Sequence, residues 1–237
     1  MRILLNHLTR MRGGHICVAG VDLETRRHVR PVLAGEMLPF YLLARYGGPF
    51  DVGQVIELGR LRAVPEAPHV EDHLFIESQA KSDRPAAAHE FWSILEELCR
   101  RRLRDVFGME LQRNCGRHYG VEPGCGTASL GFLQPGAPPD LYIAERRNGK
   151  PQVRMRFCDG EIEADAGVTD LRLHGDDHAT PNAPLVRAAA GWLKQSRRAI
   201  LAVGLTRQFR VSEREPYRHW LQVNNIHLIE TPIWRLG

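Results

Sequence analysis

The sequence predicts a β-rich α+β protein with two halves, each a small Greek-key barrel with helices packed outside it. Short segments of β-forming residues, separated by Gly-rich turns, indicate the strands of such barrels. Apolar residues at helical spacing indicate helices over 86–107 and 183–195. The order of strands, helix and strands occurs twice along the chain, and this repeated order predicts the two halves.

The first half starts with a strand over 2–8 and continues into a basic β-hairpin over 13–33. In the hairpin, β-forming residues precede and follow a polar turn at 24–27. The second strand of the hairpin contains Pro31, and because proline has no N–H to donate, this strand should lie at an edge or a bulge. Another strand is expected over 51–61, where apolar residues alternate.

The clearest helix signal of the sequence lies over 86–107, with Gly108 as the stop signal of the expected helix. A Gly- and Pro-rich stretch follows it, and a long irregular segment inside a compact protein is often functional. We therefore expect an N-terminal domain, a connecting loop and a C-terminal domain, over 1–112, 113–139 and 140–237 respectively.

The second half repeats the β-rich pattern. Its expected elements are strands over 141–144, 152–158 and 161–164, a helix over 183–195, a buried strand over 199–205 and a last strand over 220–229. An Asn-Gly pair at 148–149 is typical of a hairpin turn and would connect the first two of these strands.

Composition limits the classes of function. The net charge of +4 is mild, so any surface for polyanions must come from local clustering of basic residues. The five cysteines are an odd, scattered set, which is typical of reduced thiols rather than of a disulfide framework. No apolar run reaches the roughly 18 residues that a membrane span needs, and the short apolar start does not resemble a signal peptide. The expected location is the cytoplasm.

Potential metal ligands gather in two places. A metal-dependent phosphodiesterase would need carboxylates and histidines that converge, and the candidates are His174, Asp176, Asp177 and His178, with Asp159, Glu161, Glu163 and Asp165 upstream. The alternative interpretation is a polar loop and a solvated strand edge. A zinc site would use Cys115, His118 and Cys125, although their spacing matches no standard motif. The sequence contains no catalytic constellation, so we assign no catalytic residue, metal or cofactor, and enzymatic activity stays open.

Basic side chains cluster at the hairpin and again before the last strand. The planar guanidinium of arginine matches the geometry of phosphate. The candidate nucleic-acid contacts are Arg10, Arg12, Arg26, Arg27, Arg30, Arg207 and Arg210. The candidate groups for stacking on bases are Tyr41, Tyr46, Phe50, Tyr119, Tyr217 and Trp220. The alternative interpretation is a solvated charged turn, with the aromatic residues in the core.

Short motifs in both halves resemble the bacterial dual-OB-domain proteins. In the first half they are Gly-Gly-His-Ile-Cys-Val-Ala-Gly-Val-Asp at 13–22, His-Val-Arg-Pro-Val at 28–32 and Gly-Pro-Phe-Asp-Val-Gly-Gln-Val at 48–55. In the second half they are Val-Gly-Leu-Thr-Arg-Gln-Phe at 203–209 and His-Trp-Leu-Gln-Val at 219–223. The resemblance implies two OB-like barrels and nucleic-acid binding, in proteins of bacterial defence or DNA processing. It implies no catalytic residue.

The expected function is the binding of single-stranded or structured DNA or RNA with little sequence specificity. Two alternatives stay open, a metal-dependent nuclease or phosphodiesterase and a protein-interaction subunit of a larger complex. The expected partners are therefore nucleic acid and a protein of such a complex, and a membrane is not among them.

Overall fold

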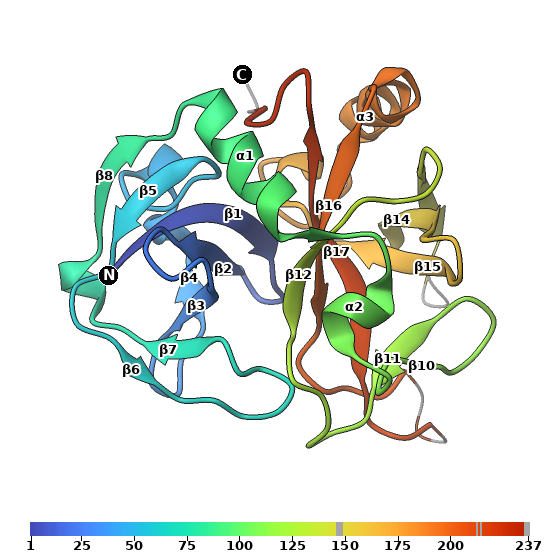
Figure 1. The fold of residues 1–237 in the computed structure, drawn as a ribbon, viewed down its shortest axis with the longest axis horizontal. Helices are drawn as coiled ribbons and strands as arrows, with labels where there is room; N and C mark the ends of the chain where they lie inside the picture. The colour runs from blue at the N-terminus through green and yellow to red at the C-terminus, as the bar shows by residue number, and fades with distance from the viewer. Residues whose placement is uncertain (146–148, 212, 214, 235–237) are drawn as a thin grey trace.

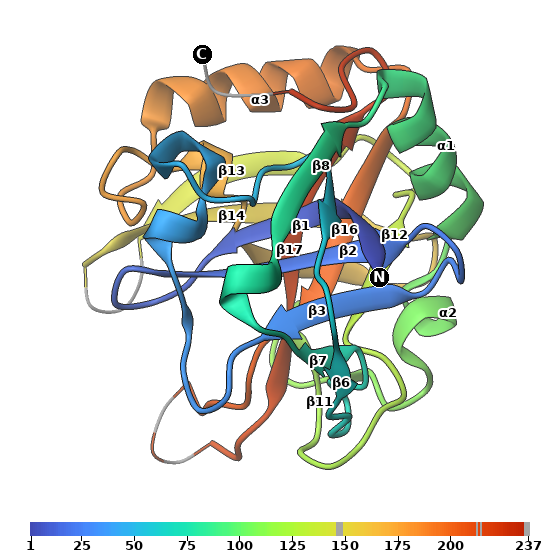
Figure 2. The same ribbon diagram turned by 90° about the vertical axis from the view of Figure 1, so that its left-hand side faces the viewer.

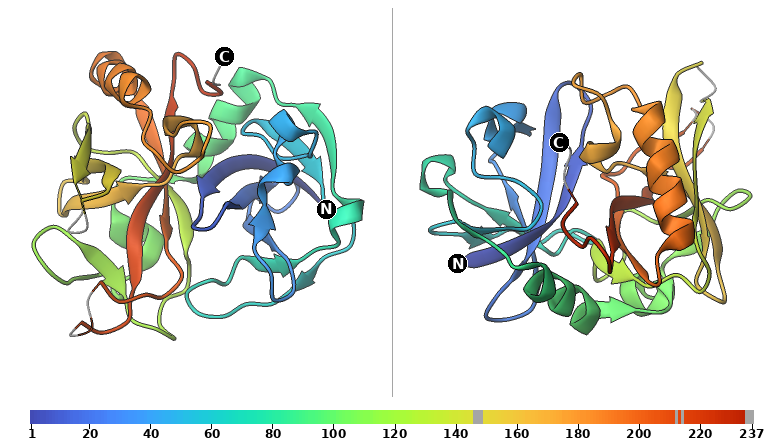
Figure 3. Two further views of the ribbon diagram at one scale, coloured as in Figure 1. Left: turned by 180° about the vertical axis from the view of Figure 1, so that it is seen from behind. Right: turned by 90° about the horizontal axis from the view of Figure 1, so that it is seen from above.

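The computed structural model describes residues 1–145, 149–211, 213 and 215–234. In this part of the chain two β-sheets lie side by side, with the N-terminal half on one side and the C-terminal half on the other (Figure 1; Figure 3, right). The helices lie outside the sheets. The arrangement confirms the predicted β-rich fold with two halves, and the described strand pairings do not close either sheet into a complete barrel.

The first sheet contains the strands up to residue 85. They are β1 (Arg2–Arg10), β2 (His15–Asp22), β3 (His28–Val32), β4 (Leu38–Pro39), β5 (Gln54–Glu57), β6 (Arg62–Ala63), β7 (Asp72–Leu74) and β8 (Lys81–Pro85). Their order is β6-β7-β3-β2-β1-β5-β8, with β4 beside β2. Three short 3-10 helices lie between them, η1 (Phe40–Leu42), η2 (Ala44–Tyr46) and η3 (Glu77–Gln79). The pairing of β3 with β7 is parallel, and the others are antiparallel.

The basic hairpin forms as predicted from β2 and β3. Across its turn, Asp22 accepts a hydrogen bond from the hydroxyl of Thr25 at 2.6 Å. Further along, β3 leaves β2 and pairs with β7. The N–H of Arg30 donates to the carbonyl of Glu71 at the start of that pairing, so the nitrogen of the next residue, Pro31, points to the side that β2 has left. The proline therefore lies where the strand has one unpaired edge, as expected.

The second sheet contains the strands from residue 99 onward. They are β9 (Cys99–Arg100), β10 (Gln112–Arg113), β11 (Tyr119–Val121), β12 (Leu130–Leu133), β13 (Asp140–Glu145), β14 (Pro151–Cys158), β15 (Glu163–Val168), β16 (Ala199–Leu205) and β17 (His219–Leu228). Their order is β13-β14-β15-β17-β16-β12-β9, and β11 lies beside both β10 and β17. Between β15 and β16 the chain forms η4 (Leu171–Leu173) and α3 (Ala183–Gln195). No helix among the described residues is long and apolar enough to cross a bilayer.

The continuous helix predicted over 86–107 is wrong. Two helices are present, α1 (Ala88–Leu98) and α2 (Leu103–Phe107). Between them, Cys99 and Arg100 form β9, which pairs in parallel with β12. The N–H of Leu103, at the start of α2, donates to the carboxylate of Asp159 at 2.7 Å. The helix is interrupted where the chain contacts β12 and Asp159, which are distant in sequence. The local spacing of apolar residues does not predict such contacts.

The stretch 113–139, predicted as a connecting loop, is not irregular throughout, because it contains β11 and β12. Every residue of β12 is buried, and the strand pairs with β16. Sheet membership changes before residue 99, since β9 and β10 both pair with strands of the C-terminal half. The division of the chain into domains over 1–112 and 140–237 stays a prediction.

β12 and β16 form a wall between two hydrophobic cores. On β12, Phe132 packs into the core of the first half and Leu133 into the core of the second. On β16, Ile200 faces the first core and Leu201 the second. Successive side chains of a strand point to opposite faces, so a strand that is apolar at every position serves both cores.

β17 meets β1 through polar side chains that are buried between the halves. Each strand has a β-bulge there, with Asn6 as the extra residue of β1 and Asn224 as that of β17. Next to the second bulge, Asn225 bonds both backbone groups of Leu8, accepting from the N–H at 2.7 Å and donating to the carbonyl at 3.3 Å. Side chains of β17 thus satisfy backbone groups of β1 that are buried at the junction.

Candidate nucleic-acid interface

The loop between β16 and β17 carries exposed aromatic and basic side chains. This β16–β17 loop spans 206–218, apart from two positions outside the described residues. The exposed fractions of Phe209 and Tyr217 are 37% and 50%. The guanidinium of Arg210 lies 5.4 Å from the ring centroid of Tyr217. An exposed ring with an arginine beside it can stack on a nucleobase and pair with the adjoining phosphate.

Hydrogen bonds join the two arms of the loop at its base. Phe209 and Arg218 exchange backbone hydrogen bonds at 3.1 and 3.2 Å. The indole N–H of Trp220 donates to the carbonyl of Phe209 at 3.0 Å, and the backbone N–H of Trp220 donates to the hydroxyl of Thr206 at 2.9 Å. Trp220, a predicted stacking group, is buried, and its hydrogen bonds hold the base of the loop.

Arg207 connects the start of the loop to the N-terminal half. Its Nη2 donates to Oδ2 of Asp72 in β7 at 2.6 Å. Oδ1 of the same carboxylate accepts from Nε of Arg30 at 2.5 Å. The side chains of Asp72 and Arg30 are buried, whereas about half of the Arg207 side chain is exposed. One carboxylate therefore neutralises a buried guanidinium and orients an exposed one.

Two buried histidines lie in the same region. Nε2 of His69 is 3.2 Å from Nδ1 of His219, which is also 2.9 Å from the carbonyl of Thr206. Burial lowers the pKa of His69 to about 2, and the charges of Arg30 and Arg207 act in the same direction. His69 is thus neutral at physiological pH.

β2 separates the basic residues of the hairpin into two groups. Arg10 and Arg12 precede it and Arg26 and Arg27 follow it, so the pairs lie at opposite ends of a strand of 8 residues. At about 3.3 Å per residue, the strand spans roughly 25 Å. The basic cluster expected from the sequence is therefore not one continuous patch.

Two of these four arginines already contact other side chains of the same protein. Nε of Arg10 donates to Nε2 of His174 at 2.8 Å, which joins the end of β1 to the C-terminal half. Arg26 lies 3.5 Å from the carboxylate of Glu97 on α1. Both guanidinium groups would have to share or leave these contacts to bind a phosphate.

The remaining hairpin arginines differ in their exposure. Arg30 is buried in its ion pair with Asp72 and does not reach the surface. Arg12 and Arg27 are exposed, and neither forms an ion pair with a described carboxylate. Among the candidates from the sequence, Arg30 and Arg207 are brought together through the carboxylate that they share, and Arg210 lies beside Tyr217.

The predicted stacking residues also differ. Tyr41, Tyr46 and Tyr217 are each about half exposed. Phe50 is fully buried in the first core, and Tyr119 packs against the second. The ring of Phe50 is therefore structural, because no base can reach a ring that the core covers, whereas the ring of Tyr119 is partly buried.

The side chains proposed as metal ligands near 174–178 each have a partner in the protein. Asp176 pairs with Arg45 at 2.9 Å, and Nε2 of His178 lies 3.0 Å from the hydroxyl of Tyr46. Asp177 accepts hydrogen bonds from the hydroxyl and the backbone of the following turn, which lowers the pKa of its carboxyl to about 2. The fourth candidate ligand, His174, accepts a hydrogen bond from Arg10. The contacts of His174, Asp176 and His178 join the C-terminal half to the first half, and those of Asp177 stay within its own turn.

The other candidate ligands are dispersed as well. Asp159 is buried and accepts from backbone N–H groups, so it does not share an exposed face with its neighbours. The ion pairs of the others are Glu161 with Arg102, Glu163 with Arg117 and Asp165 with Arg154. Cys115 and Cys125 are exposed thiols, and His118 contacts a backbone carbonyl. No group of three or more His, Cys, Asp or Glu in the described ranges is placed to hold a metal.

Two residues of the interface were not candidates from the sequence. Phe209 ends one of the motifs that carry the family resemblance, and that is the one signal that could have drawn attention to it. Asp72 has no such signal, because its role depends on arginines 42 residues before it and 135 residues after it.

Residues 1–226 match the model of a protein family that is described as the dual OB-containing domain, so the match covers nearly the whole chain. A search of curated proteins found no match. OB-folds are Greek-key barrels that often bind nucleic acid through strand faces and the loops that join them. With two strand-rich halves and a family match over both, the chain belongs to the family of the dual OB-containing domain.

Proposed function

We propose that the protein binds single-stranded or structured nucleic acid with little sequence specificity, and that the β16–β17 loop is the main contact. The observation that carries the proposal is the exposed pair Phe209 and Tyr217 in the same loop as Arg207 and Arg210, with Arg210 beside Tyr217. Aromatic rings stack on any unpaired base, and guanidinium groups pair with phosphates whatever the sequence. A duplex hides the faces of its bases, so unpaired stretches are favoured.

Asp72 orders Arg207, and because a guanidinium has five N–H donors, Arg207 can keep this contact and share its remaining donors with a phosphate. Asp72 accepts from one nitrogen of that guanidinium, at 2.6 Å, and so restricts the side chain before a ligand arrives. A group that is already ordered loses less conformational entropy on binding. Arg30 holds Asp72 from the other side and is assigned that structural role.

The exposed arginines of the hairpin extend the proposed contact. Arg12 and Arg27 are accessible cations, whereas Arg10 and Arg26 already contact His174 and Glu97 of the same chain. A nucleic acid that reached both ends of β2 would follow the N-terminal half for roughly 25 Å. The proposed setting is the bacterial cytoplasm, in a defence or DNA-processing system, and this part rests on the family resemblance.

The proposal is tested by fluorescence anisotropy of labelled oligothymidylate, titrated with the protein over a range of salt concentrations. Phe209→Ala should weaken binding by about 1–3 kcal/mol, roughly 5- to 150-fold, because one base loses its stacking partner. Replacing Arg207 and Arg210 by Ala should reduce the slope of log affinity against log salt by about 1.4, since each phosphate contact with a single strand contributes about 0.7.

A matched control replaces Arg60 and Arg101, two exposed arginines outside the loop, by Ala. It changes the net charge equally, and the slope should stay close to that of the unmodified protein. An equal fall in both double variants would mean that overall charge, and not the loop, determines binding.

The two alternative functions differ in their support. The described residues give no support to a metal-dependent nuclease, because each candidate ligand is bonded to another group of the protein and the ligands do not converge. A role in protein interaction is favoured by a separate groove on the C-terminal half.

A further inference from the structure

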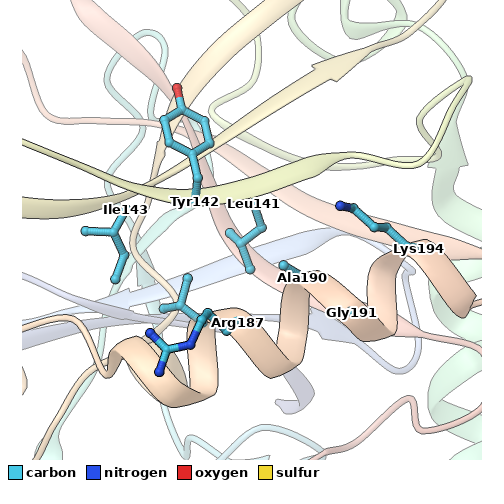
Figure 4. Close-up of a pocket in the computed structure, with 8 residues that line it drawn as sticks. Leu141, Tyr142, Ile143, Arg187, Ala190, Gly191 and Lys194 are labelled. Atoms are coloured by element: carbon cyan, nitrogen blue, oxygen red, sulfur yellow. The ribbon is translucent and has the colours of Figure 1, made fainter.

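An open groove of about 460 Å³ runs between β13 and α3 (Figure 4). Leu141 and Ile143 of β13 line one wall, and Arg187, Ala190 and Lys194 of α3 line the other. In Figures 1 and 2, α3 lies at the top of the molecule and the β16–β17 loop at the bottom. The groove is therefore separate from the proposed nucleic-acid interface.

The helix wall has cations at its ends and small residues between them. Arg187, Ala190, Gly191 and Lys194 recur at helical spacing and form one stripe along α3. Both cations are exposed, and neither forms an ion pair with a described carboxylate. A Cβ atom added at Gly191 would meet nothing within 4 Å. Packing therefore does not require glycine at this position, and glycine weakens the interior of a helix. Because glycine has no side chain, it leaves the groove open.

The strand wall offers backbone groups as well as apolar side chains. Among the described strands, β13 pairs only with β14 and lies at the edge of its sheet. Tyr142 points away from α3 (Figure 4), and its hydroxyl donates to Asp165 at 2.7 Å. It therefore borders the groove with its backbone. The N–H and C=O groups on the outer side of an edge strand can pair with a strand from another chain.

We propose that this groove binds an extended acidic peptide segment of a partner protein, which adds a strand beside β13. Charge complementarity selects carboxylates, because both ionic side chains that line the groove, Arg187 and Lys194, are cations. The floor is aliphatic, and the ring of Tyr142 is turned away. Nucleobases would thus find no aromatic platform in the groove, and such platforms are what single-stranded nucleic acid requires.

The geometry also sets the spacing within the peptide. Arg187 and Lys194 are two helical turns apart, which is about 10 Å along the axis. In an extended strand, residues i and i+4 share a face and are about 13 Å apart. The long side chains of the two cations cover the difference. The preferred segment therefore has acidic residues at i and i+4, with an apolar residue at i+2 that fills the space over Gly191.

The test measures fluorescence anisotropy of a labelled peptide, Gly-Ser-Glu-Thr-Leu-Thr-Glu-Ser-Gly, titrated with the full-length protein. We expect saturable binding that is lost when both Glu are replaced by Lys, and weakened when Leu is replaced by Ser. No binding of the acidic peptide, or equal binding of the acidic and basic peptides, would overturn the proposal.

Variants of the protein locate the site. Arg187→Glu with Lys194→Glu should weaken peptide binding at least about tenfold, because like charges then face each other. Gly191→Leu should have a similar effect by filling the groove, and leucine is well tolerated in helices. Arg60→Glu with Arg101→Glu makes the same change of net charge elsewhere and should leave binding unchanged. A peptide that binds both groove variants as it binds the unmodified protein would contradict the assignment.

Oligothymidylate separates this proposal from the proposed function. It should not displace the peptide, and its own binding should be insensitive to Gly191→Leu. Displacement of the peptide together with loss of oligothymidylate binding in Gly191→Leu would assign the groove to nucleic acid instead. Peptide binding without any nucleic-acid binding would refute the proposed function and leave the groove proposal intact.

Discussion

The carboxylate of Asp72 holds the guanidinium of Arg207 at 2.6 Å, although the two residues are 135 positions apart in the chain. Asp72 belongs to the first sheet and Arg207 to the loop that follows β16 in the second. The contact also includes Arg30, which is buried on the other oxygen of the same carboxylate. The proposed binding loop is thus positioned by the N-terminal half, and its geometry depends on how the two halves pack.

The Asp72→Ala substitution should destabilise the protein strongly. It leaves the guanidinium of Arg30 buried without its counter-charge, and removing one partner of a buried ion pair costs about 3–5 kcal/mol. The free energy of unfolding, measured by urea titration, should fall by that amount. Arg207→Ala removes a half-exposed partner and should cost about 1 kcal/mol or less. Equal losses in the two variants would show that Arg30 does not depend on Asp72.

The Asn225→Ala substitution should weaken the junction between β17 and β1. Both backbone groups of Leu8 lose their partner in a buried position, and each buried unsatisfied group costs about 1–3 kcal/mol. We expect the free energy of unfolding to fall by at least about 2 kcal/mol in urea titrations. Asn114→Ala is the control at an exposed position and should stay within about 0.5 kcal/mol of the unmodified protein. A similar small change in Asn225→Ala would mean that water replaces the amide.

Stability should decrease as the pH falls below about 6.5. Burial lowers the pKa of His227 and of His174 to about 4, with smaller contributions from Arg172 and Arg10. The unfolded chain binds these protons near the ordinary value of 6.5 and the folded chain only near 4. Their contribution to stability is therefore complete above 6.5 and is lost progressively as the pH falls toward 4.

Urea titrations at several pH values measure this loss. Each of these histidines adds up to about 1.4 kcal/mol per pH unit between the two pKa values. His227→Asn should reduce the slope by one proton, whatever its effect on stability at neutral pH. A free energy of unfolding that is constant between pH 7 and pH 5 would contradict the burial of neutral imidazoles.

Two glycines should respond to alanine in opposite directions. Gly191→Ala should raise the free energy of unfolding by about 0.5–1 kcal/mol, since its new Cβ meets nothing within 4 Å and alanine favours the helix. Gly53 has a φ of +79°, and a Cβ there would lie 2.5 Å from the side chain of Ile233. Gly53→Ala should therefore be destabilising. Thermal unfolding of the two variants in parallel gives the comparison, and the same sign for both would contradict it.

The long, regular elements were predictable from the sequence because their signals are local. The apolar run of β16 and the helical spacing of α3 each lie within one element, and the helix over 183–195 has the predicted bounds. The same holds for the β2–β3 hairpin and for the placement of Pro31, since turn residues and the missing N–H of proline act on their immediate neighbours. Short family motifs in both halves identified the dual OB-containing domain.

The site depended on contacts between distant residues. Arg30 has the same sequence signal as Arg27, yet Arg27 is exposed and Arg30 is buried, because Asp72 from β7 reaches only the latter. Likewise, the helix expected over 86–107 is interrupted where Cys99 pairs with Phe132 of β12.

Sequence by itself therefore determined the β-rich class, the two halves, the family and the elements that local periodicity specifies. Only the tertiary structure decided which charged and aromatic side chains are accessible. The physical reason is that burying a charge is favourable only beside a partner of opposite charge, and here that partner lies 42 residues away. Exposure of a ring is likewise decided by the residues that pack over it: Phe50 lies within the first core, while Phe209 stays at the surface of a loop.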